Sequence, residues 1–307
     1  MKRSAALFFS ESDLQLARDN LDREPVHSAL SVLDTQRTDP LEAAQLFALN
    51  YLFRHDGTAG DAALEVLLPQ NFSSDASLDL PAMKAQLGWL SVMAMLRGHP
   101  RWQSVAETSR SQIDSLARRE LQSSADMCPL RLSWLAAVSM AEASLSGDDA
   151  GFQRAADVYR RVVDAHIHPE GYFKDLVDID GASETYAAQF SATCALVLMA
   201  EMAEQIGVDL WAYHNRAVSV NTAATYTYYY YFFPETWKWE ADLTRETTMG
   251  LMRRDGAFFE MVNRRAPLRG VEQLFAEQRP MFSAIGGGLT TLTHGLVPPK
   301  KRRWTLW

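Results

Sequence analysis

Histidines and cysteines are the residues of this sequence with the most direct chemistry, metal binding above all. His166 and His168 lie two positions apart just before a proline, as in a metal-binding pair. A zinc site needs three or four ligands at suitable spacing, and no suitable third ligand accompanies these two. We therefore expect no metal, and we interpret the pair as the end of a helix, where a cation is favourable. Cys128 and Cys194 are too few for a disulfide framework and lack metal-site spacing, which predicts free, buried thiols.

Aromatic residues could bind a sugar. Trp134, Trp237 and Trp239 offer flat apolar surfaces on which a sugar ring can stack, although large aromatic side chains more often serve the core. We expect Trp134 and one of the other two, Trp239, to contact a sugar. Residues 226–233 are aromatic at nearly every position, so this tract cannot have a wholly solvated face. It is interpreted as a buried helix or strand-like segment, with the wall of a sugar-binding cleft as the alternative.

No motif of this chain predicts a cofactor. Residues 286–288 are a triple glycine, but without a following Lys-Ser/Thr they form no phosphate loop, and a tight turn explains them better. Nothing resembles a Ser-His-Asp elbow or a zinc-protease helix. The 307 residues include 30 basic and 38 acidic ones, a formal charge of -8, which argues against a general nucleic-acid binder. A polyanionic ligand would need a local basic cleft.

The elements that must position these residues are predicted to be helices. Apolar residues recur at helical spacing almost throughout, and no segment alternates with a period of two over several turns. Asp39 and Pro40 start one helix well, because aspartate caps free amides and proline is tolerated at the first position. This helix extends to Phe53, and further amphipathic stretches cover roughly residues 11–21, 60–68, 80–97, 100–121, 130–146, 150–167, 183–206, 208–223 and 239–263. Paired helices without a fixed-period repeat predict an all-α solenoid or toroid of antiparallel hairpins.

The start of the chain bears on its compartment. No apolar run reaches the roughly 18 residues of a membrane span, so we expect no membrane contact. Lys2 and Arg3, followed by residues 4–9, imitate a signal peptide, but the apolar part is shorter than the roughly 7 to 15 residues that such a signal needs. We expect a periplasmic protein whose signal has been removed, with the cytoplasm as the alternative.

Four motifs follow one another in a set order, at residues 51–67, 147–176, 195–213 and 279–291. Together they extend over about three quarters of the chain, and as a set they resemble the alginate lyases of polysaccharide lyase family 5. The resemblance implies an incomplete (α/α) toroid with a deep groove, formed by residues 1–307 as a single domain. It also implies a cofactor-free enzyme, expected to be a monomer, whose partner is an acidic polysaccharide.

Within this resemblance, the family's catalytic positions fall on two predicted helices. Its segment Cys-Asn-Asn-His-Ser-Tyr-Trp falls on residues 128–134, where the cysteine and the tryptophan agree. Leu130 stands at the asparagine and Arg131 at the histidine. The catalytic tyrosine falls on Ser191 or, with a one-residue slip, on the residue before it. The nearest tyrosine, Tyr186, is roughly one helical turn away.

The chemistry implied is β-elimination from a 4-linked uronic acid, which requires that the carboxylate be neutralised, the C5 proton removed and the O4 leaving group protonated. We expect Arg131 to neutralise the carboxylate, which its planar fork matches, or to take part in proton removal. We expect Tyr186 to act as acid or base. The alternatives are an arginine that pairs with a nearby carboxylate and a tyrosine that simply packs. Gln189 shares the helix face of Tyr186, three positions on, and is expected to contact substrate.

Further substrate contacts follow from the resemblance. Lys174 follows the turn that approaches the groove in the family, and Arg245 lies beyond an aromatic and basic stretch. Both are expected to bind carboxylates in neighbouring subsites, and an exposed salt bridge is an equal alternative for each. His168, close in sequence to the same turn, is expected to bind substrate, and substitution for the family's histidine by His166 or His168 is left open. Trp134 and Trp239 complete the expected binding residues.

The leading hypothesis is an endolytic lyase for a uronate-containing bacterial exo- or capsular polysaccharide. Alginate is one candidate substrate. A galactosaminuronate capsule such as the Vi antigen is another, because its axial O4 leaves anti to the C5 proton. The alternative is a non-catalytic protein that binds acidic polysaccharide with a degenerate lyase fold, and a helical-repeat scaffold for protein partners is a third.

Overall fold

The computed structural model describes residues 6–70, 79–102, 127–179 and 183–298. In these ranges the chain forms helices and three isolated β-bridges but no strand, which confirms the all-α prediction. The α-helices are α1 (Glu11–Arg18), α2 (Val26–Leu33), α3 (Pro40–Arg54), α4 (Gly57–Leu67), α5 (Leu80–Met95), α8 (Pro129–Ser146), α9 (Asp149–His166), α10 (Lys174–Val177), α11 (Thr185–Glu204), α12 (Val220–Phe232), α13 (Arg245–Asp255), α14 (Phe259–Arg265), α15 (Val271–Gln278) and α16 (Thr290–Thr293). Two 3-10 turns are η1 (Pro234–Thr236) and η2 (Gly256–Phe258).

Local sequence starts and ends these helices. The Asp39 carboxylate accepts a backbone N–H of the first turn of α3, and Pro40 is the first helical residue, which confirms the predicted start. Gly147 ends α8 with a left-handed φ of 76°, a conformation that glycine adopts without steric cost. Asp148, directly after it, caps α9 with its side chain. The chain therefore reverses from α8 into α9 within two residues.

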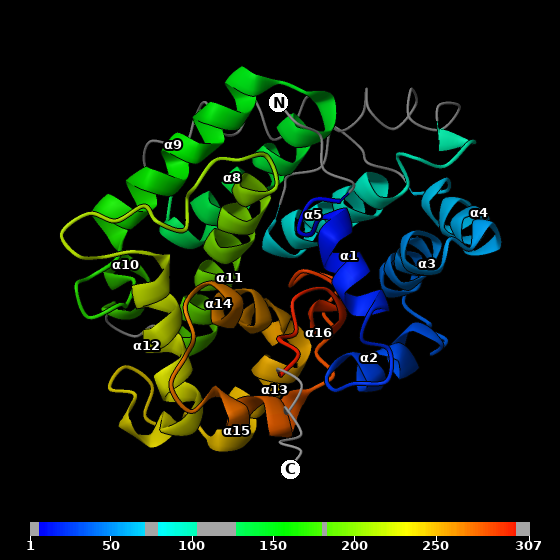
Figure 1. Ribbon diagram of the computed structural model, residues 1–307. Helices are drawn as coiled ribbons and strands as arrows, with labels where there is room; N and C mark the ends of the chain where they lie inside the picture. Colours follow the sequence, from blue (N-terminus) through cyan, green and yellow to red (C-terminus); the bar gives the residue numbers. More distant parts are fainter. Residues whose placement is uncertain (1–5, 71–78, 103–126, 180–182, 299–307) are drawn as a thin grey trace, which may run out of the picture.

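Neighbouring inner helices run in the same direction. In the middle of α3, Gln45 Nε2 donates to the carbonyl oxygen of Gly88 in the middle of α5, at 3.3 Å. Late in α3, the ring of Tyr51 packs against that of His99, just after α5, with 5.2 Å between centroids. Contacts at matching heights along both helices show that α3 and α5 are parallel. α4 and α9 return along the outside of α3 and α8 as hairpin partners (Figure 1).

The helices α8 and α11 form the centre of the fold. α8 packs against α5 on one side and α11 on the other. Every residue of α11 from Gln189 to Ala203 is buried. By length and composition α11 could cross a membrane, but 89% of its most apolar window is buried inside the protein, so it is a core helix. The series α3, α5, α8 and α11, with return helices outside, is the predicted incomplete (α/α) toroid.

Two predicted helices differ from the structure. The sequence predicts a helix over 208–223, but α12 begins only at Val220. The reason is a turn at residues 215–218, where Arg216 and Ala217 have positive φ angles of 52° and 62° that no right-handed helix allows. The helix predicted over 239–263 is interrupted between α13 and α14 by the turn η2. Most of the helix predicted over 100–121 lies outside the described residues.

The aromatic tract 226–233 lies almost entirely in α12, which confirms its interpretation as a helix. Tyr228 and Tyr231 face the core, and Tyr231 is fully buried. Tyr229 remains 48% exposed, because each residue of a helix is rotated by about 100° from the one before it, so the residue after Tyr228 points away from the core. The tract therefore has one core face and one face towards solvent.

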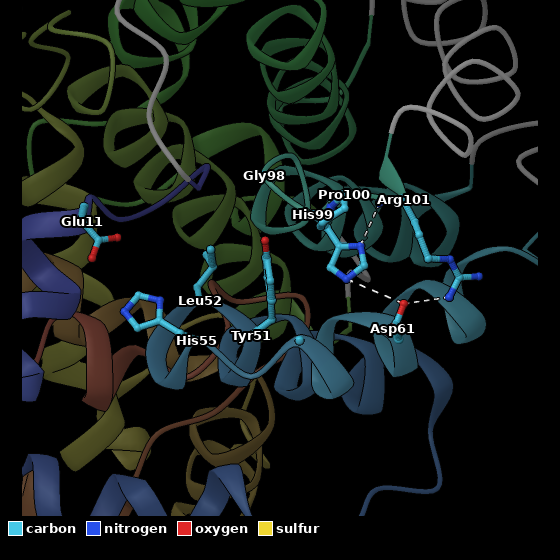
Figure 2. Close-up of a pocket in the computed structure, with 10 residues that line it drawn as sticks. Glu11, Tyr51, Leu52, His55, Asp61, Gly98, His99, Pro100 and Arg101 are labelled. Atoms are coloured by element: carbon cyan, nitrogen blue, oxygen red, sulfur yellow. Dashed lines mark hydrogen bonds and ion pairs between the residues drawn. The ribbon is translucent and has the colours of Figure 1, made fainter.

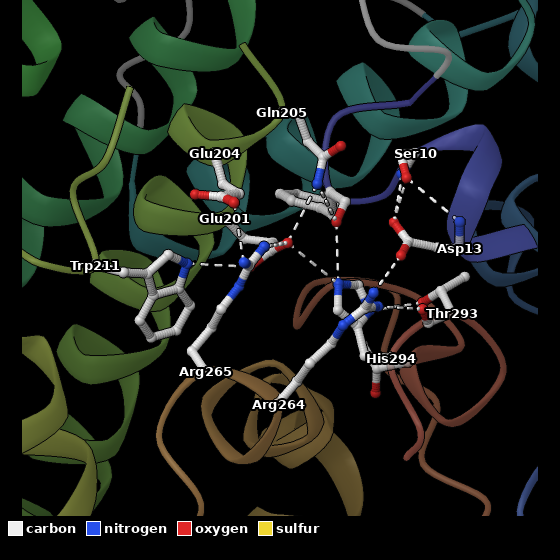
Figure 3. A network of polar contacts seen from close by, with 12 residues as sticks. Ser10, Asp13, Glu201, Glu204, Gln205, Trp211, Arg264, Arg265, Thr293 and His294 are labelled. Carbon is white, nitrogen blue, oxygen red and sulfur yellow. Dashed lines mark hydrogen bonds and ion pairs between the residues drawn. The ribbon is translucent and has the colours of Figure 1, made fainter. Parts of the chain in front are cut away.

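The C-terminal helices close the space between α11 and the N-terminal helices, with α16 packed on α1 and α2 (Figure 1). A polar network holds this closure together (Figure 3). Its centre is Glu201 of α11, which is 1% exposed and accepts from Arg265 Nη2 at 3.0 Å. His294 Nε2 lies 3.5 Å from Glu201 and 3.1 Å from the carbonyl oxygen of Phe8. Residues near both ends of the chain are thereby tied to the central helix.

Candidate active site

A cluster of three side chains joins the early turns of α5, α8 and α11. Trp134 Nε1 on α8 donates to Ser191 Oγ on α11 at 3.0 Å. Lys84 Nζ on α5 lies 5.2 Å from the centroid of the Trp134 ring, within range of a cation–π interaction. Lys84 is half-buried, whereas Trp134 is 1% exposed. Three consecutive inner helices thus each contribute one residue to the same place, which we name the Lys84 cluster (Lys84, Trp134 and Ser191).

Arg131 adds a second cation to this end of the fold. It precedes Trp134 by three positions, so it lies on the same face of α8. It is half-buried. Both cations belong to the N-terminal parts of helices whose dipoles already favour anions. Two side-chain cations and two helix dipoles therefore favour an anion at this end of the fold, in a protein of formal charge -8.

Two further groups lie deeper beside the Lys84 cluster. Burial raises the pKa of the Cys194 thiol; the charge of Lys84 opposes this more weakly, and that of Asp255 adds to it. The thiol therefore stays protonated and is no nucleophile. Asp255, 6% exposed, accepts from Arg254 Nε at 3.1 Å through one carboxylate oxygen, while the other has no partner among the residues described. Cys194 is a free buried thiol as predicted, whereas the free thiol of Cys128, the N-cap residue of α8, is exposed and not buried as predicted.

Tyr186 is placed in the core and not at a substrate-accessible surface. Its side chain is fully buried, and its hydroxyl donates to the carbonyl oxygen of Thr227 at 3.0 Å. Burial raises its pKa, and the weaker attraction of Arg245 does not reverse this. A hydroxyl that is sealed, hydrogen-bonded and hard to ionise cannot exchange protons with a sugar. We therefore replace the predicted acid–base role with the packing role that was its alternative.

Gln189 has a structural role of the same kind. Its side chain is fully buried, accepts the backbone N–H of Phe173 at 2.9 Å and donates to the carbonyl oxygen of Gly171 at 3.0 Å. It also donates to Thr227 Oγ1 at 3.3 Å, so it shares a face with Tyr186, as the spacing predicts. Because these bonds use its amide, Gln189 holds the turn before α10 in place and does not contact a substrate.

The indole of Trp134 is likewise closed off. With 1% of its surface exposed, the indole packs in the core, which favours the core role over the predicted stacking role. Its ring supports Lys84 and its N–H holds Ser191. Trp134 therefore orients the two residues of the cluster that are closer to solvent.

His168 and Trp239 come together on a second surface, which we name the aromatic surface (His168, Tyr172, Lys238 and Trp239). The His168 ring stacks on Tyr172 with 4.4 Å between centroids, and Tyr172 contacts Trp239 at 4.7 Å. Lys238 Nζ lies 4.3 Å from the centroid of Trp239. A cation beside flat rings is suited to an acidic sugar, and these two predictions remain open.

The other two predicted cations differ in their surroundings. Lys174, the first residue of α10, is exposed in the turn that leads from the aromatic surface. Arg245 donates to the carbonyl oxygen of Tyr231 at 2.8 Å, pairs with Glu277, and stacks over the Tyr231 ring. Since its guanidinium is occupied by these contacts, the salt-bridge alternative describes Arg245.

Sequence reasoning missed Lys84 and Lys238. Lys84 is the one charged residue of α5, and it lies near the helix end where a cation is unfavourable. A charge at an unfavourable helix position suggests a functional role, so the position of Lys84 could have identified it from the sequence. Lys238 stands between two tryptophans in the sequence, which is a second such signal. No local pattern shows that Lys84 faces Trp134, since the two residues are 50 positions apart in the chain.

Comparison with known proteins gives these residues a context. The family model described as alginate lyase matches residues 45–237, more than half of the chain. This chain belongs to the alginate lyase family. As a member it is a polysaccharide lyase, and the two helices on which the family's histidine and tyrosine fall by sequence are those that meet at Trp134 and Ser191. No curated protein matches the sequence.

Solved structures of alginate lyases share the fold. A variant of alginate lyase A1-III in complex with a tetrasaccharide superposes with a TM-score of 0.75 at 14% identity, over 96% of both chains. Alginate lyase A1-III from Sphingomonas species A1 gives 0.69 at 17% identity, over 85% of this chain and 76% of that one. An alginate lyase from Bacteroides ovatus gives 0.65 at 11% identity, over 95% and 99%. The toroid prediction is thereby confirmed.

Proposed function

We propose that this lyase cleaves a uronate-containing polysaccharide at the Lys84 cluster, by β-elimination, with alginate and a galactosaminuronate capsule such as the Vi antigen as the two leading substrates. The observation that carries the proposal is the pair of cations, Lys84 and Arg131, on the early turns of adjacent inner helices. Arg131 neutralises the carboxylate of the sugar, and water or hydroxide from solvent takes up the C5 proton. A double bond forms between C4 and C5 as the bond from C4 to O4 breaks, and O4 leaves with a proton from solvent. Without that neutralisation the enolate that forms would carry two negative charges.

Lys84 supplies the second positive charge. Its ammonium rests against the Trp134 ring, so part of its water shell is already replaced by an aromatic face. A charge held in this way needs little reorganisation when an anionic sugar approaches. The indole also fixes Ser191, a residue of which 8% is exposed, so that its hydroxyl is held in place beside the proposed sugar site.

The aromatic surface extends the proposed substrate contacts. Trp237 Nε1 donates to Thr185 Oγ1 at 2.8 Å, which attaches the segment that carries Lys238 and Trp239 to the start of α11. Lys238 and Trp239 would bind sugars further along the polymer, where stacking and charge both contribute. Lys174 is available for the same purpose.

The test follows the absorbance of the unsaturated uronate while the enzyme is incubated with alginate, polygalacturonate and the Vi antigen. At least one polymer is expected to give a rising signal. Lys84→Met and Arg131→Met should each lower kcat/KM by about 10²-fold or more, as loss of a charge that stabilises a transition state does. Arg154→Met on the outer helix α9, whose side chain is 52% exposed, is the matched control and should retain activity.

Two results would count against the proposal. Activity close to wild type in both Met variants, with folding retained, would remove the two cations from the mechanism. Binding of an acidic polymer, with no absorbance change for alginate, polygalacturonate or the Vi antigen, would favour the non-catalytic alternative. This alternative is tested because the Tyr186 hydroxyl is buried and bonded to the Thr227 carbonyl, so it does not serve as an acid or base.

A further inference from the structure

A cavity of about 610 Å³ opens at the other end of the inner helices, where α3 and α5 finish (Figure 2). Tyr51 lies in the last turns of α3, and Gly98 follows α5. Because α3 and α5 are parallel, their C-terminal ends lie together, away from Lys84 near the start of α5. Lys84 and Gly98 are 14 positions apart, about 20 Å along a helix. The cavity is therefore distinct from the proposed active site.

The wall of the cavity combines apolar surface with a fixed donor and acceptor. Leu52 and the Tyr51 ring provide the apolar part. His99 is 7% exposed, and its Nδ1 accepts the backbone N–H of Arg101 at 3.3 Å. In neutral histidine this assigns the proton to Nε2, which points towards Asp61 Oδ1 at 3.8 Å (Figure 2). An N–H donor thus stands beside a carboxylate acceptor.

The charged side chains of Glu11, Asp61 and Arg101, which line the cavity, form ion pairs. Arg101 Nη1 contacts Asp61 Oδ1 at 2.7 Å, and Glu11 contacts Arg18 at 2.6 Å. Among the described residues that line the cavity, no lysine or arginine is left unpaired to attract a phosphate or a uronate, and His55 is, apart from His99 beside Asp61, the one further group there that could carry a positive charge. In contrast, the Tyr51 hydroxyl and the second carboxylate oxygen of Asp61 have no hydrogen-bond partner in the part of the chain that the structure describes.

We propose that this cavity binds an uncharged, hydroxyl-rich ligand, a neutral sugar of one or two rings. Such a ring has an apolar face of C–H groups for Tyr51 and Leu52, and hydroxyls for Asp61 and the His99 N–H. The volume lies within the range of about 300 to 1,000 Å³ that is usual for small-molecule sites. The site is independent of the lyase chemistry, whose substrate is anionic.

Two glycines make a clean test possible. Gly57 lines the cavity, and a Cβ built on it meets no atom within 4 Å, so Gly57→Trp adds a bulky side chain at the cavity without a clash at its first atom. Gly250 on α13 is equally open and lies outside the cavity, which makes Gly250→Trp the matched control. Thermal unfolding of both variants checks that each is folded.

The experiment is a calorimetric titration of the full chain with glucose, galactose, mannose, maltose, lactose and cellobiose, with glucuronate and inorganic phosphate in parallel. At least one neutral sugar is expected to bind, and Gly57→Trp to abolish that binding while Gly250→Trp retains it. Asp61→Asn and Tyr51→Phe should each weaken binding about tenfold, since each loses one hydrogen bond to the ligand. Lys84→Met should bind as wild type, which separates this result from the lyase test.

The proposal is overturned if none of the six sugars binds at concentrations up to about 10 mM, a weak affinity for a specific site. It is also overturned if binding persists in Gly57→Trp, because the ligand would then occupy another place. Binding of glucuronate or phosphate that excludes the neutral sugars and is lost in Gly57→Trp would show an anion site instead.

Discussion

Glu201 offers a prediction whose size can be worked out from the structure. Its carboxylate is buried between α11 and the C-terminal helices and accepts from Arg265 and from Trp211 Nε1, the latter at 3.1 Å (Figure 3). Burial alone would raise its pKa. The hydrogen bonds and charges of His294 and Arg265 outweigh burial and lower the pKa from 4.5 to about 2.

The depressed pKa implies a pH-dependent stability. A carboxylate with a lower pKa in the folded state stabilises the fold fully above pH 4.5, and this contribution disappears as the pH falls towards 2. The difference between 4.5 and about 2 corresponds to about 3 kcal/mol, of which about half is lost by pH 3. With about 2.1 cal/mol/K of unfolding entropy per residue over 307 residues, 3 kcal/mol amounts to about 5 °C in Tm.

The perturbation is Glu201→Gln, which keeps the shape and removes the charge. Urea unfolding is followed by circular dichroism at pH 7, 5, 4 and 3, together with wild type. We expect the variant to be less stable by about 3 kcal/mol at pH 7, and the difference to narrow by about half at pH 3. Glu204→Gln is the matched control, because Glu204 also pairs with Arg265, at 2.9 Å, but is 37% exposed. It should cost less than about 1 kcal/mol.

A constant difference between wild type and Glu201→Gln from pH 7 to pH 3 would refute the reasoning, because the effect would then not come from the ionised carboxylate. An equal cost for Glu204→Gln would refute it as well. In that case burial would not distinguish the two carboxylates that share Arg265.

Three further substitutions test the structural roles assigned around α11. Tyr186→Phe removes the hydrogen bond that the hydroxyl donates to the Thr227 carbonyl and should cost about 1 to 2 kcal/mol in urea unfolding, with lyase turnover unchanged; a turnover loss at unchanged stability would restore the catalytic role. Gln189→Leu strands two buried backbone groups, the Phe173 N–H and the Gly171 carbonyl, and should cost about 2 to 4 kcal/mol, so a Tm equal to wild type would contradict its assignment. Gly171→Ala should cost about 2 kcal/mol or more in thermal unfolding, because φ is 110° there and a Cβ would lie 2.6 Å from a backbone oxygen of α12; a neutral effect would mean that the turn is not held in this form.

Much of the fold was predictable because the determinants of its helices are local. The start of α3 depends on the adjacent residues Asp39 and Pro40. The helical spacing of apolar residues predicted the positions of α5, α8, α9 and α11 to within a few residues. The errors arose where a local conformation overrode periodicity. The left-handed residues Arg216 and Ala217 delay α12, and η2 divides the stretch predicted as one helix.

The sequence by itself determined the helical elements, their hairpin order and, through ordered motifs, the family. It did not determine which side chains face solvent. Tyr186, Gln189 and Trp134 have the residue types of a sugar site, yet all three are buried, whereas Lys84 acquires its partner from a helix 50 residues away in the chain. The physical reason is that helical spacing specifies which residues share a face, but only the packing of one helix against another decides whether that face is core or surface.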